Sequence, residues 1–348
     1  MHMSDALLSP AVGATMWAAT AAAAAYSVKR VQSEMDQKKV PLMGVMGAFI
    51  FTAQMINFSI PGTGSSGHLG GGLLLAVLLG PYAGFLTMAS ILAIQALFFA
   101  DGGLLALGAN VFNLGFSTCF VAYPFIYRKI VGRKGGPRRI IIASLVAAVI
   151  GLQMGAFGVV LETLASGRTE LPFGAFVSLM QPIHLAIGVV EGLVTAAVVG
   201  FVWKARPELM ERAFLNRALG DLSIRKVLLG LAAGAVLIGA GLSWFASSHP
   251  DGLEWAMFKT SGKEELEATS SVHMKLGGVQ KRTAILPDYG FKGPEAEGTS
   301  GDTKGESWPA IDVGTTVSGL LGGLMTLLLA GLMGLMINQA AKPKGNGL

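Results

Sequence analysis

The chain has 348 residues, of which 52% are hydrophobic and only 14% are charged, and its mean hydropathy is +0.58. Soluble domains carry about 25% charged residues, so this composition excludes a soluble globular protein and predicts a polytopic membrane protein. The single cysteine, Cys119, excludes both a disulfide framework and a thiolate metal cage. A net charge of +5 would suit nucleic acid, but the placement of the basic residues explains it more simply. No nucleic-acid partner is therefore expected.

Apolar segments predict seven membrane spans in the first 204 residues. In chain order they cover residues 10–28, 40–58, 69–80, 82–99, 107–126, 140–164 and 176–203. We place a break at Gly80-Pro81 because proline removes a backbone donor and interrupts a helix. One long helix in place of two short ones would put six later cations outside the cytoplasm. The segment 69–80 is short for a full crossing, and a partly re-entrant segment is the alternative.

The remaining residues predict a second, smaller module. A charged cytoplasmic linker covers residues 205–226, and the module itself covers residues 227–340. Its two spans, 227–246 and 313–338, form a hairpin around a large external segment, 247–312. In this arrangement 18 of the 26 Lys and Arg residues are cytoplasmic, as the positive-inside rule requires. The predicted fold class is therefore an all-α helix bundle in the membrane, with an extracytoplasmic N-terminus and a cytoplasmic C-terminus.

The first two residues form a metal-chelating arrangement. The free α-amine of Met1, the amide nitrogen of His2 and the His2 ring nitrogen nearest the backbone can lie in one plane around a divalent ion. The predicted topology puts His68, at the end of the Gly/Ser-rich loop 61–68, on the same external face, where its imidazole would complete a square. Planar coordination by four nitrogens suits Ni(II) or Cu(II) better than zinc or magnesium. We therefore predict a metal site made by Met1, His2 and His68, with Ni(II) or Co(II) as the captured ion.

Four motifs, in the same order, resemble the CbiM/NikM family. They are Met1-His2, Ser66–Gly71, Gln95–Gly103 and Ala106–Asn113, and the resemblance covers about residues 1–204. This family contains the substrate-capture components of energy-coupling factor transporters for cobalt and nickel. In addition, Pro250–Trp255 resembles the PDGLE module, which is related to the NikN accessory subunit, over about residues 225–340. The whole chain resembles a fusion of the two.

The resemblance implies a seven-helix capture unit with an external N-terminus in the cell membrane of a prokaryote. It implies metal ligation by Met1, His2 and His68, with the ion as transported substrate and with no organic cofactor. It also implies partners: a transmembrane coupling subunit and two ATP-binding-cassette ATPases, besides membrane lipid. This agrees with the lack of a GxxxxGK[ST] nucleotide loop in the chain. Where the family usually has an Asp-Gly or Glu-Gly turn, this chain has Ser4-Asp5-Ala6, so the N-terminal loop is expected to differ.

Polar residues near the predicted site are candidates for orienting the ligands, with ordinary helix-to-helix hydrogen bonding as the alternative for each. These candidates are Asp5, Ser66, Gln95, Asn110 and Asn113. We expect Asp101, in a Gly-rich external turn, to be structural. We also expect Pro250–Trp255 to anchor the external segment on the capture unit, and the two histidines of that segment, His249 and His273, to lie in a solvated domain.

Two other kinds of function are compatible with the sequence. His184 and Glu191 share one face of the span 176–203, and Glu162 lies in the preceding span; ionisable residues inside a membrane mark functional sites. These three residues would serve an intramembrane enzyme or a proton-coupled carrier. A metal-sensing scaffold would use the predicted metal site without ATPase partners. The sequence does not distinguish nickel from cobalt, because the Irving–Williams series places copper ahead of both.

Overall fold

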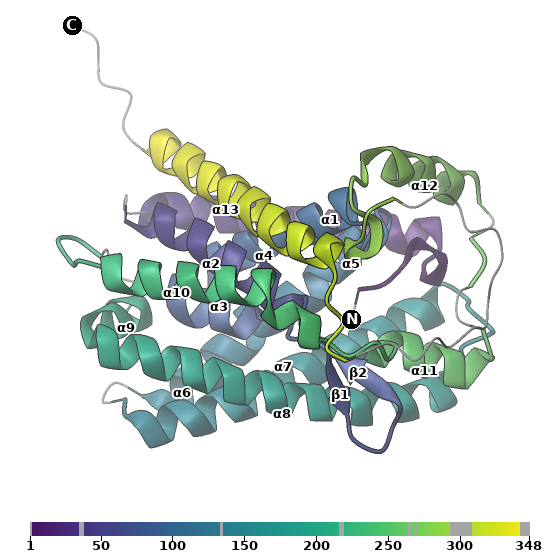
Figure 1. Ribbon diagram of the computed structural model, residues 1–348, viewed down its shortest axis with the longest axis horizontal. Coiled ribbons are helices and arrows are strands. Elements are labelled where there is room, and N and C mark those ends of the chain that lie inside the picture. Colours follow the sequence, from purple (N-terminus) through teal and green to yellow (C-terminus); the bar gives the residue numbers. More distant parts are fainter. Residues whose placement is uncertain are drawn as a thin grey trace, which may run out of the picture.

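The computed structural model describes residues 2–34, 38–132, 135–215, 219–263, 266–268, 270–292 and 308–341, and Met1 lies outside them. The described residues form a bundle of helices that run roughly side by side (Figure 1). In the first half of the chain these are α1 (Pro10–Glu34), α2 (Lys39–Gln54), α3 (Gly72–Leu79), α4 (Pro81–Phe98) and α5 (Leu107–Val111). A π-helical segment, Phe112–Tyr127, continues α5 into α6 (Arg128–Val131) without interruption.

The second half begins with two long neighbouring helices, α7 (Pro137–Ala165) and α8 (Phe173–Ala205). A short helix, α9 (Pro207–Phe214), lies within the predicted linker, and α10 (Arg225–Ala240) follows it. The predicted external segment contains α11 (Gly252–Ser261) and α12 (Ser271–Thr283), and the last helix is α13 (Val313–Ala341). Each predicted span therefore coincides with a helix, and the linker and the external segment add further ones.

Six of the described helices are long and apolar enough to cross a membrane. They are residues 10–33, 81–98, 107–131, 137–165, 173–205 and 313–340. The chain is thus a multi-pass membrane protein. The other three helices at predicted spans are shorter, with 16 residues in α2 and α10 and 8 in α3. At a rise of about 1.5 Å per residue, 16 residues reach about 24 Å, less than the roughly 30 Å hydrocarbon core of a bilayer.

The predicted break between residues 69 and 99 is confirmed. α3 ends at Leu79 and α4 begins at Pro81, with Gly80 between them at a φ of +87°. A side chain rarely adopts this backbone conformation, so glycine permits the interruption between the two helices. Proline then occupies the first position of α4, where no intrahelical donor is needed.

A short β-hairpin is added to the helical architecture. The span predicted at 40–58 ends as a helix at Gln54, and the chain then forms β1 (Phe58–Ile60) and β2 (Ser65–Gly67). The strands are antiparallel, and Phe58 is paired with Gly67. The hairpin carries His68 directly after its second strand and so fixes where that residue enters the bundle.

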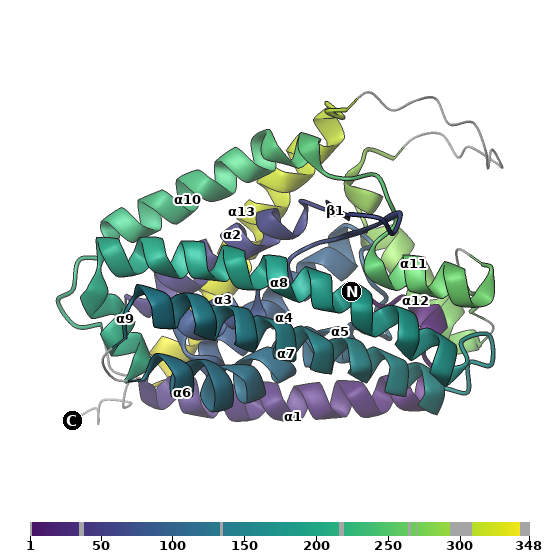
Figure 2. The same ribbon diagram turned by 90° about the horizontal axis from the view of Figure 1, so that it is seen from below.

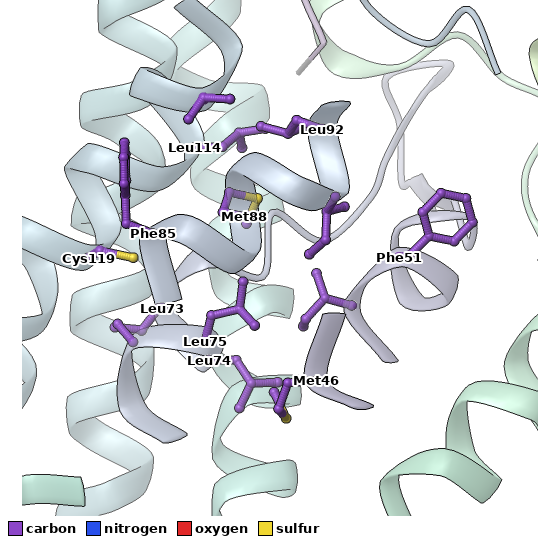
Figure 3. Close-up of a cluster of buried hydrophobic side chains, with 14 of the residues drawn as sticks. Met46, Phe51, Leu73, Leu74, Leu75, Phe85, Met88, Leu92, Leu114 and Cys119 are labelled. Carbon is purple, nitrogen blue, oxygen red and sulfur yellow. The ribbon is translucent and has the colours of Figure 1, made fainter. Parts of the chain in front are cut away.

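The hydrophobic core lies around the α3–α4 pair. Figure 3 shows Leu73, Leu74 and Leu75 of α3 facing side chains from α2, α4 and the π-helical segment, all of them buried. The other labelled members of this cluster are Met46, Phe51, Phe85, Met88, Leu92, Leu114 and Cys119. α1, α7, α8 and α13 surround this centre and expose more of their apolar side chains, as lipid-facing helices do.

Small residues bring the helices into close contact. A Cβ atom added at Gly192 of α8 would lie 2.6 Å from the Cα of Leu145 in α7, and one at Gly188 would lie 2.9 Å from the Cα of Val149. In the C-terminal module, a Cβ atom at Gly319 of α13 would lie 2.7 Å from the Cα of Gly239 in α10. Close backbone approach through small residues is how helices associate in a bilayer. α10 and α13 also pack on α2, so the two predicted modules form one bundle.

The two ends of the bundle differ in character. Figures 1 and 2 show α6 and α9 at one end and the β-hairpin, α11 and α12 at the other. α11 packs on α8 and β2, whereas α12 packs on α4. The predicted anchoring of Pro250–Trp255 on the first module is therefore seen, and the candidate site lies at this end.

Candidate metal centre

The N-terminal segment is inserted into the bundle ahead of α1. Met3 is fully buried, and its backbone is held on both sides by the Asn110 side chain of α5. The Met3 N–H donates to Asn110 Oδ1 at 2.8 Å, and Asn110 Nδ2 donates to the Met3 carbonyl at 3.1 Å. The N–H of Gly103 donates to the same carbonyl at 2.9 Å. Asn110, one of the predicted orienting residues, thus fixes the residue that follows His2.

Asp5 begins a 3₁₀ turn, Asp5–Leu7. This turn lies where the sequence departs from the Asp-Gly or Glu-Gly pattern. Its Oδ1 accepts a hydrogen bond from the N–H of Ala106 at 3.0 Å. Burial raises the pKa of this carboxyl above its ordinary value, and the backbone donors around it oppose the shift. Leu7, at the end of the turn, and Leu8, which follows it, are buried. The departure in the N-terminal motif therefore still gives a turn that is tied to the bundle.

The rings of His2 and His68 are stacked at the end of this segment. Their centroids are 4.9 Å apart and their planes differ by 5°. The side chains are 7% and 8% exposed, and the Nε2 atom of His2 has no hydrogen-bond partner among the described residues. Burial lowers the pKa of His68 to about 3, so its imidazole is neutral at physiological pH and retains a nitrogen lone pair that can bind metal.

Asp101, expected to be structural, contacts His2 directly. Its Oδ1 lies 3.0 Å from Nδ1 of His2, and its Oδ2 accepts a hydrogen bond from the Tyr289 hydroxyl at 2.5 Å. Burial would raise the pKa of Asp101, but its interaction with the adjacent His2 ring and the hydrogen bonds from His2 and Tyr289 outweigh burial and hold the pKa below its ordinary value. Tyr289 belongs to the C-terminal module, so both modules contribute to this contact.

Asp251 brings a second carboxyl group from the C-terminal module. Its Oδ2 lies 3.9 Å from Nε2 of His68, and its Oδ1 accepts the backbone N–H groups of Leu253 and Glu254 at the start of α11. Burial alone would raise the pKa of Asp251, but its interactions with neighbouring groups and the hydrogen bond from the Glu254 backbone hold that pKa below the ordinary value. The loop that carries it is joined to β2, because the Ser66 N–H donates to the carbonyl of Pro250 at 2.8 Å.

The remaining predicted residues fall into two groups. Ser66 contacts the C-terminal module, since its hydroxyl also donates to the His249 carbonyl at 2.7 Å. Gln95 reaches the loop after His68 through Gln54, to which it donates at 2.8 Å. Asn113, in contrast, donates to Glu162 Oε2 at 2.8 Å and is not part of the site. For Asn113 the alternative of ordinary helix-to-helix hydrogen bonding holds.

The three intramembrane ionisable residues do not meet one another. His184 is hydrogen-bonded through Nδ1 to the Met180 carbonyl, and its Nε2 lacks a hydrogen-bond partner among the described residues. Glu191 accepts hydrogen bonds from the backbone of Gly70 and Gly71. Glu162 is bound to Asn113, as described above. A small cavity connects His184 to the candidate site, and its lining consists of Gly67, His68, Gly70, Leu114, Leu152, His184, Ile187, Asp251 and Gly252.

The two histidines of the predicted external segment differ in their surroundings, because His273 is buried and His249 is exposed. His273 of α12 uses both ring nitrogens, with Nδ1 at 2.7 Å from the Ser270 hydroxyl and Nε2 at 2.9 Å from the Leu8 carbonyl. It therefore ties α12 to the N-terminal segment and is not in a solvated domain. Within the part of the chain that the structure describes, no group of three or more His, Cys, Asp or Glu side chains could hold a metal ion.

Sequence reasoning did not identify three contributors to the site. Asp101 and Asp251 carry signals that could have been used, because both are carboxyl groups predicted on the same external face as His2 and His68. Tyr289 carries no such signal, since a single tyrosine in a long polar segment has no pattern around it. All three lie more than thirty positions from either histidine along the chain, and only the fold brings them together.

Comparison with known proteins agrees with this architecture. The model of the family described as "Cobalt uptake substrate-specific transmembrane region" (CbiM) matches residues 2–209, and that of the PDGLE domain matches residues 225–339. A solved structure described as a truncated transition metal transporter is 33% identical, with a TM-score of 0.53, and the alignment covers 59% of this chain and 99% of that one. The fold and these matches define a membrane transport protein and not an enzyme.

Relatives with related names extend the comparison. The chain is 40% identical over 214 residues to a putative fused nickel transport protein NikMN of Archaeoglobus fulgidus, which covers 61% of this chain and 68% of the relative. It is 33% identical over 223 residues to the cobalt transport protein CbiM of Geobacter sulfurreducens, and the alignment covers 61% of this chain and 62% of that protein. This chain belongs to the CbiM family and carries a C-terminal PDGLE domain.

Proposed function

We propose that this protein is the substrate-binding component of an ATP-driven uptake transporter of the energy-coupling factor type, with Ni(II) or Co(II) as substrate. Its ligands are the N-terminal amine of Met1, the amide and ring nitrogen of His2, and the imidazole of His68. The family match and the names of the relatives support the metal and the transport role. Met1 lies outside the described residues, so its part follows from the chemistry of the chelate.

The observation that carries this proposal is the stacked pair of His2 and His68. The two residues are separated by 66 positions in the sequence, yet their ring centroids are 4.9 Å apart in a buried place at the very start of the chain. A chelate formed by a terminal amine and the next residue needs the terminus inside the protein and a second imidazole beside it. The buried Met3 and its clasp by Asn110 provide that position.

The distribution of cations supports an extracytoplasmic site. The end of the bundle opposite the histidines is formed by α6, α9 and the ends of α7 and α8 (Figures 1 and 2). It carries Arg128, Lys129, Arg138, Arg139, Lys204, Arg206 and Arg212. Basic residues flanking membrane helices stay in the cytoplasm, so their distribution supports an extracytoplasmic position for the candidate site. Other cations used in the same prediction, Arg133, Lys134, Arg217, Lys342 and Lys344, lie outside the described residues.

Transport requires partners that supply energy, and we propose a transmembrane coupling subunit and two ATP-binding-cassette ATPases. A metal-sensing scaffold would bind the ion without them. Affinity purification of the tagged full chain from its native membrane separates these two functions. Recovery of a membrane subunit together with ATPases supports the transporter, whereas recovery of the chain alone with bound nickel supports the scaffold.

The proton-coupled carrier is not favoured by the geometry. His184, Glu191 and Glu162 each bind a different backbone or side-chain partner, so no continuous chain of ionisable groups crosses the bundle through them. Glu191 also touches the loop of His68. Replacing all three residues therefore does not separate a carrier from a metal-capture protein, and His184 with Glu162 is the appropriate pair for that comparison.

The decisive experiment places one extra residue before Met1. This insertion moves the amine out of chelate range and leaves every side chain in place. We expect nickel and cobalt affinity, measured by titration calorimetry on the purified full chain, to fall by at least about tenfold. His68→Ala should weaken binding as well, and His249→Ala, at an exposed histidine of the external segment, serves as the control. Unchanged affinity in the insertion variant would remove the proposed site.

A further inference from the structure

The turn that carries His68 into the bundle is held by a carboxyl group from the middle of α8. Glu191 is 1% exposed. Its Oε2 accepts the N–H of Gly70 at 2.8 Å, and its Oε1 accepts the N–H of Gly71 at 3.1 Å. One side chain thus satisfies two consecutive backbone donors at the start of α3, immediately after His68-Leu69. Such buried donors would otherwise have no water to bind.

The opposite side of the same turn is held by two glutamines. Gln54, at the end of α2, donates through Nε2 to the Gly70 carbonyl at 2.8 Å. Gln95 of α4 donates in turn to Gln54 Oε1 at 2.8 Å. Both polar groups of the Gly70 backbone are therefore fixed, the N–H by α8 and the C=O by α2, and this leaves the turn little freedom to shift.

The glycines of the turn allow this close approach. A Cβ atom at Gly70 would lie 3.1 Å from Glu191 Oε2 and 3.2 Å from Leu114 Cδ2, and one at Gly72 would lie 2.2 Å from the Thr118 hydroxyl. Gly71 has a φ of +80°, which a side chain rarely adopts. The backbone of the turn consequently lies directly against α8 and the π-helical segment, where the Glu191 carboxyl group reaches its donors.

We propose that Glu191 is a positioning residue for metal capture, which sets the place of the His68 imidazole through the N–H groups of Gly70 and Gly71. This inference rests on the proposed function. The two carboxylate oxygens of Glu191 act on the backbone of the turn, at Gly70 and Gly71. Mutation of a residue that orients a metal ligand typically weakens metal affinity about ten- to a hundredfold. Removal of the Glu191 carboxyl group is therefore expected to weaken binding without removing any ligand.

The chain offers a matched control in Glu162. This carboxyl group is also buried in a long membrane helix, and it accepts one hydrogen bond from the Asn113 side chain. This hydrogen bond does not involve the turn after His68. A general effect of removing a buried carboxyl group from the bundle should appear in Glu162→Gln as well, whereas an effect transmitted through the turn should appear only at position 191.

The test compares nickel affinity of the full chain with Glu191→Ala and Glu191→Gln, each in the native sequence and in a His68→Ala background. In the native background we expect Glu191→Ala to weaken binding about ten- to a hundredfold. Glu191→Gln keeps the shape and one acceptor, so it should lose less and serves if the alanine variant does not fold. In the His68→Ala background neither substitution should change affinity further, because the imidazole through which they act is gone.

A spectroscopic readout separates positioning from general destabilisation. The visible absorption of bound Ni(II) reports its ligand field, and in Glu191→Ala it should move towards that of His68→Ala, while Glu162→Gln keeps the native spectrum. Native affinity and spectrum in both position-191 variants would overturn the inference, and so would equal losses in the two backgrounds. If His68→Ala itself binds nickel as well as the native chain, the proposed ligand set fails first, and the inference falls with it.

Discussion

The Nδ1 atom of His2 lies 3.0 Å from Oδ1 of Asp101. This is the ring nitrogen that a chelate through the His2 amide requires, so the carboxyl group and the metal ion compete for the same atom. The Tyr289 hydroxyl donates to the other oxygen of Asp101 at 2.5 Å and holds the carboxyl group in place. Metal binding through the proposed chelate would therefore have to open a contact to which both modules of the chain contribute.

The first prediction concerns this competition. Asp101→Asn removes the charge that binds Nδ1 and weakens a charge-assisted hydrogen bond of about 1.5–3 kcal/mol. We expect the variant to be less stable than the native chain in metal-free buffer, but to gain more in melting temperature when nickel is added. Thermal unfolding with and without nickel measures both. A smaller gain in the variant would mean that Asp101 acts on the loaded site as a favourable negative charge.

The second prediction concerns pH. Burial lowers the pKa of His68 to about 3, below the value of about 6.5 for a free histidine. The folded ring stays neutral between these values while the unfolded chain takes up a proton, so this group lowers stability as pH falls from about 6.5 towards 3. It also releases no proton when nickel binds at pH 7. The protons displaced by metal come from the terminal amine and amide of the chelate.

Nickel affinity should therefore fall by about tenfold per pH unit for each proton displaced, and His68→Gln should show the same slope from a lower starting affinity. Titration calorimetry at pH 8, 7 and 6 measures both slopes. A shallower slope in His68→Gln would contradict the neutral state of the ring.

The third prediction uses two asparagines that lie close together along one continuous helix. Asn110 binds the backbone of Met3 twice, whereas Asn113 binds Glu162. Asn110→Ala frees the N-terminal segment and should weaken nickel binding at least about tenfold. Asn113→Ala should leave affinity within about twofold, although it costs stability of about 1–3 kcal/mol by leaving Glu162 without its donor. Equal affinity losses in the two variants would mean that the clasp on Met3 has no specific role.

The fourth prediction tests the contact between α11 and the first module. A Cβ atom at Gly252 would lie 2.3 Å from Ile183 Cγ2 of α8, so Gly252→Ala should displace α11 together with Asp251 and cost about 1–3 kcal/mol. We expect faster release of nickel, which competition with a chelator in stopped flow can follow. Gly278→Ala in α12, where a Cβ atom meets nothing within 4 Å, is the control. Equal release rates would show that the C-terminal module does not cover the site.

Much of the fold could be predicted because its signals are local. Apolar segment length placed every helix of the membrane region, and Gly80-Pro81 marked the break between α3 and α4. The pairing of His2 with His68 could be predicted from topology, since two predicted spans separate them and an even number of crossings returns the chain to the same face. The end of α2 at Gln54 could not, because the apolar residues after it continue into the β-hairpin without a change in composition.

The finer parts of the site depend on tertiary contacts that no spacing reveals. Asn110 and Asn113 look alike in sequence, yet only the first faces the N-terminal segment. Glu191 was recognisable as an unusual charge in the membrane, but its partners are backbone N–H groups more than a hundred residues away. A backbone donor has no identity in a sequence, so a residue that binds one cannot be matched to it in advance.

Asp251 and Tyr289 reach a site whose histidines belong to the other module, and all four residues lie on one polypeptide. A separate accessory protein would have to meet its partner by diffusion and at a ratio set by expression. Tethering on one chain replaces that encounter by a local concentration in the millimolar range. In this protein each first module is therefore always accompanied by one C-terminal module, and this one-to-one ratio does not depend on the abundance of the protein in the membrane.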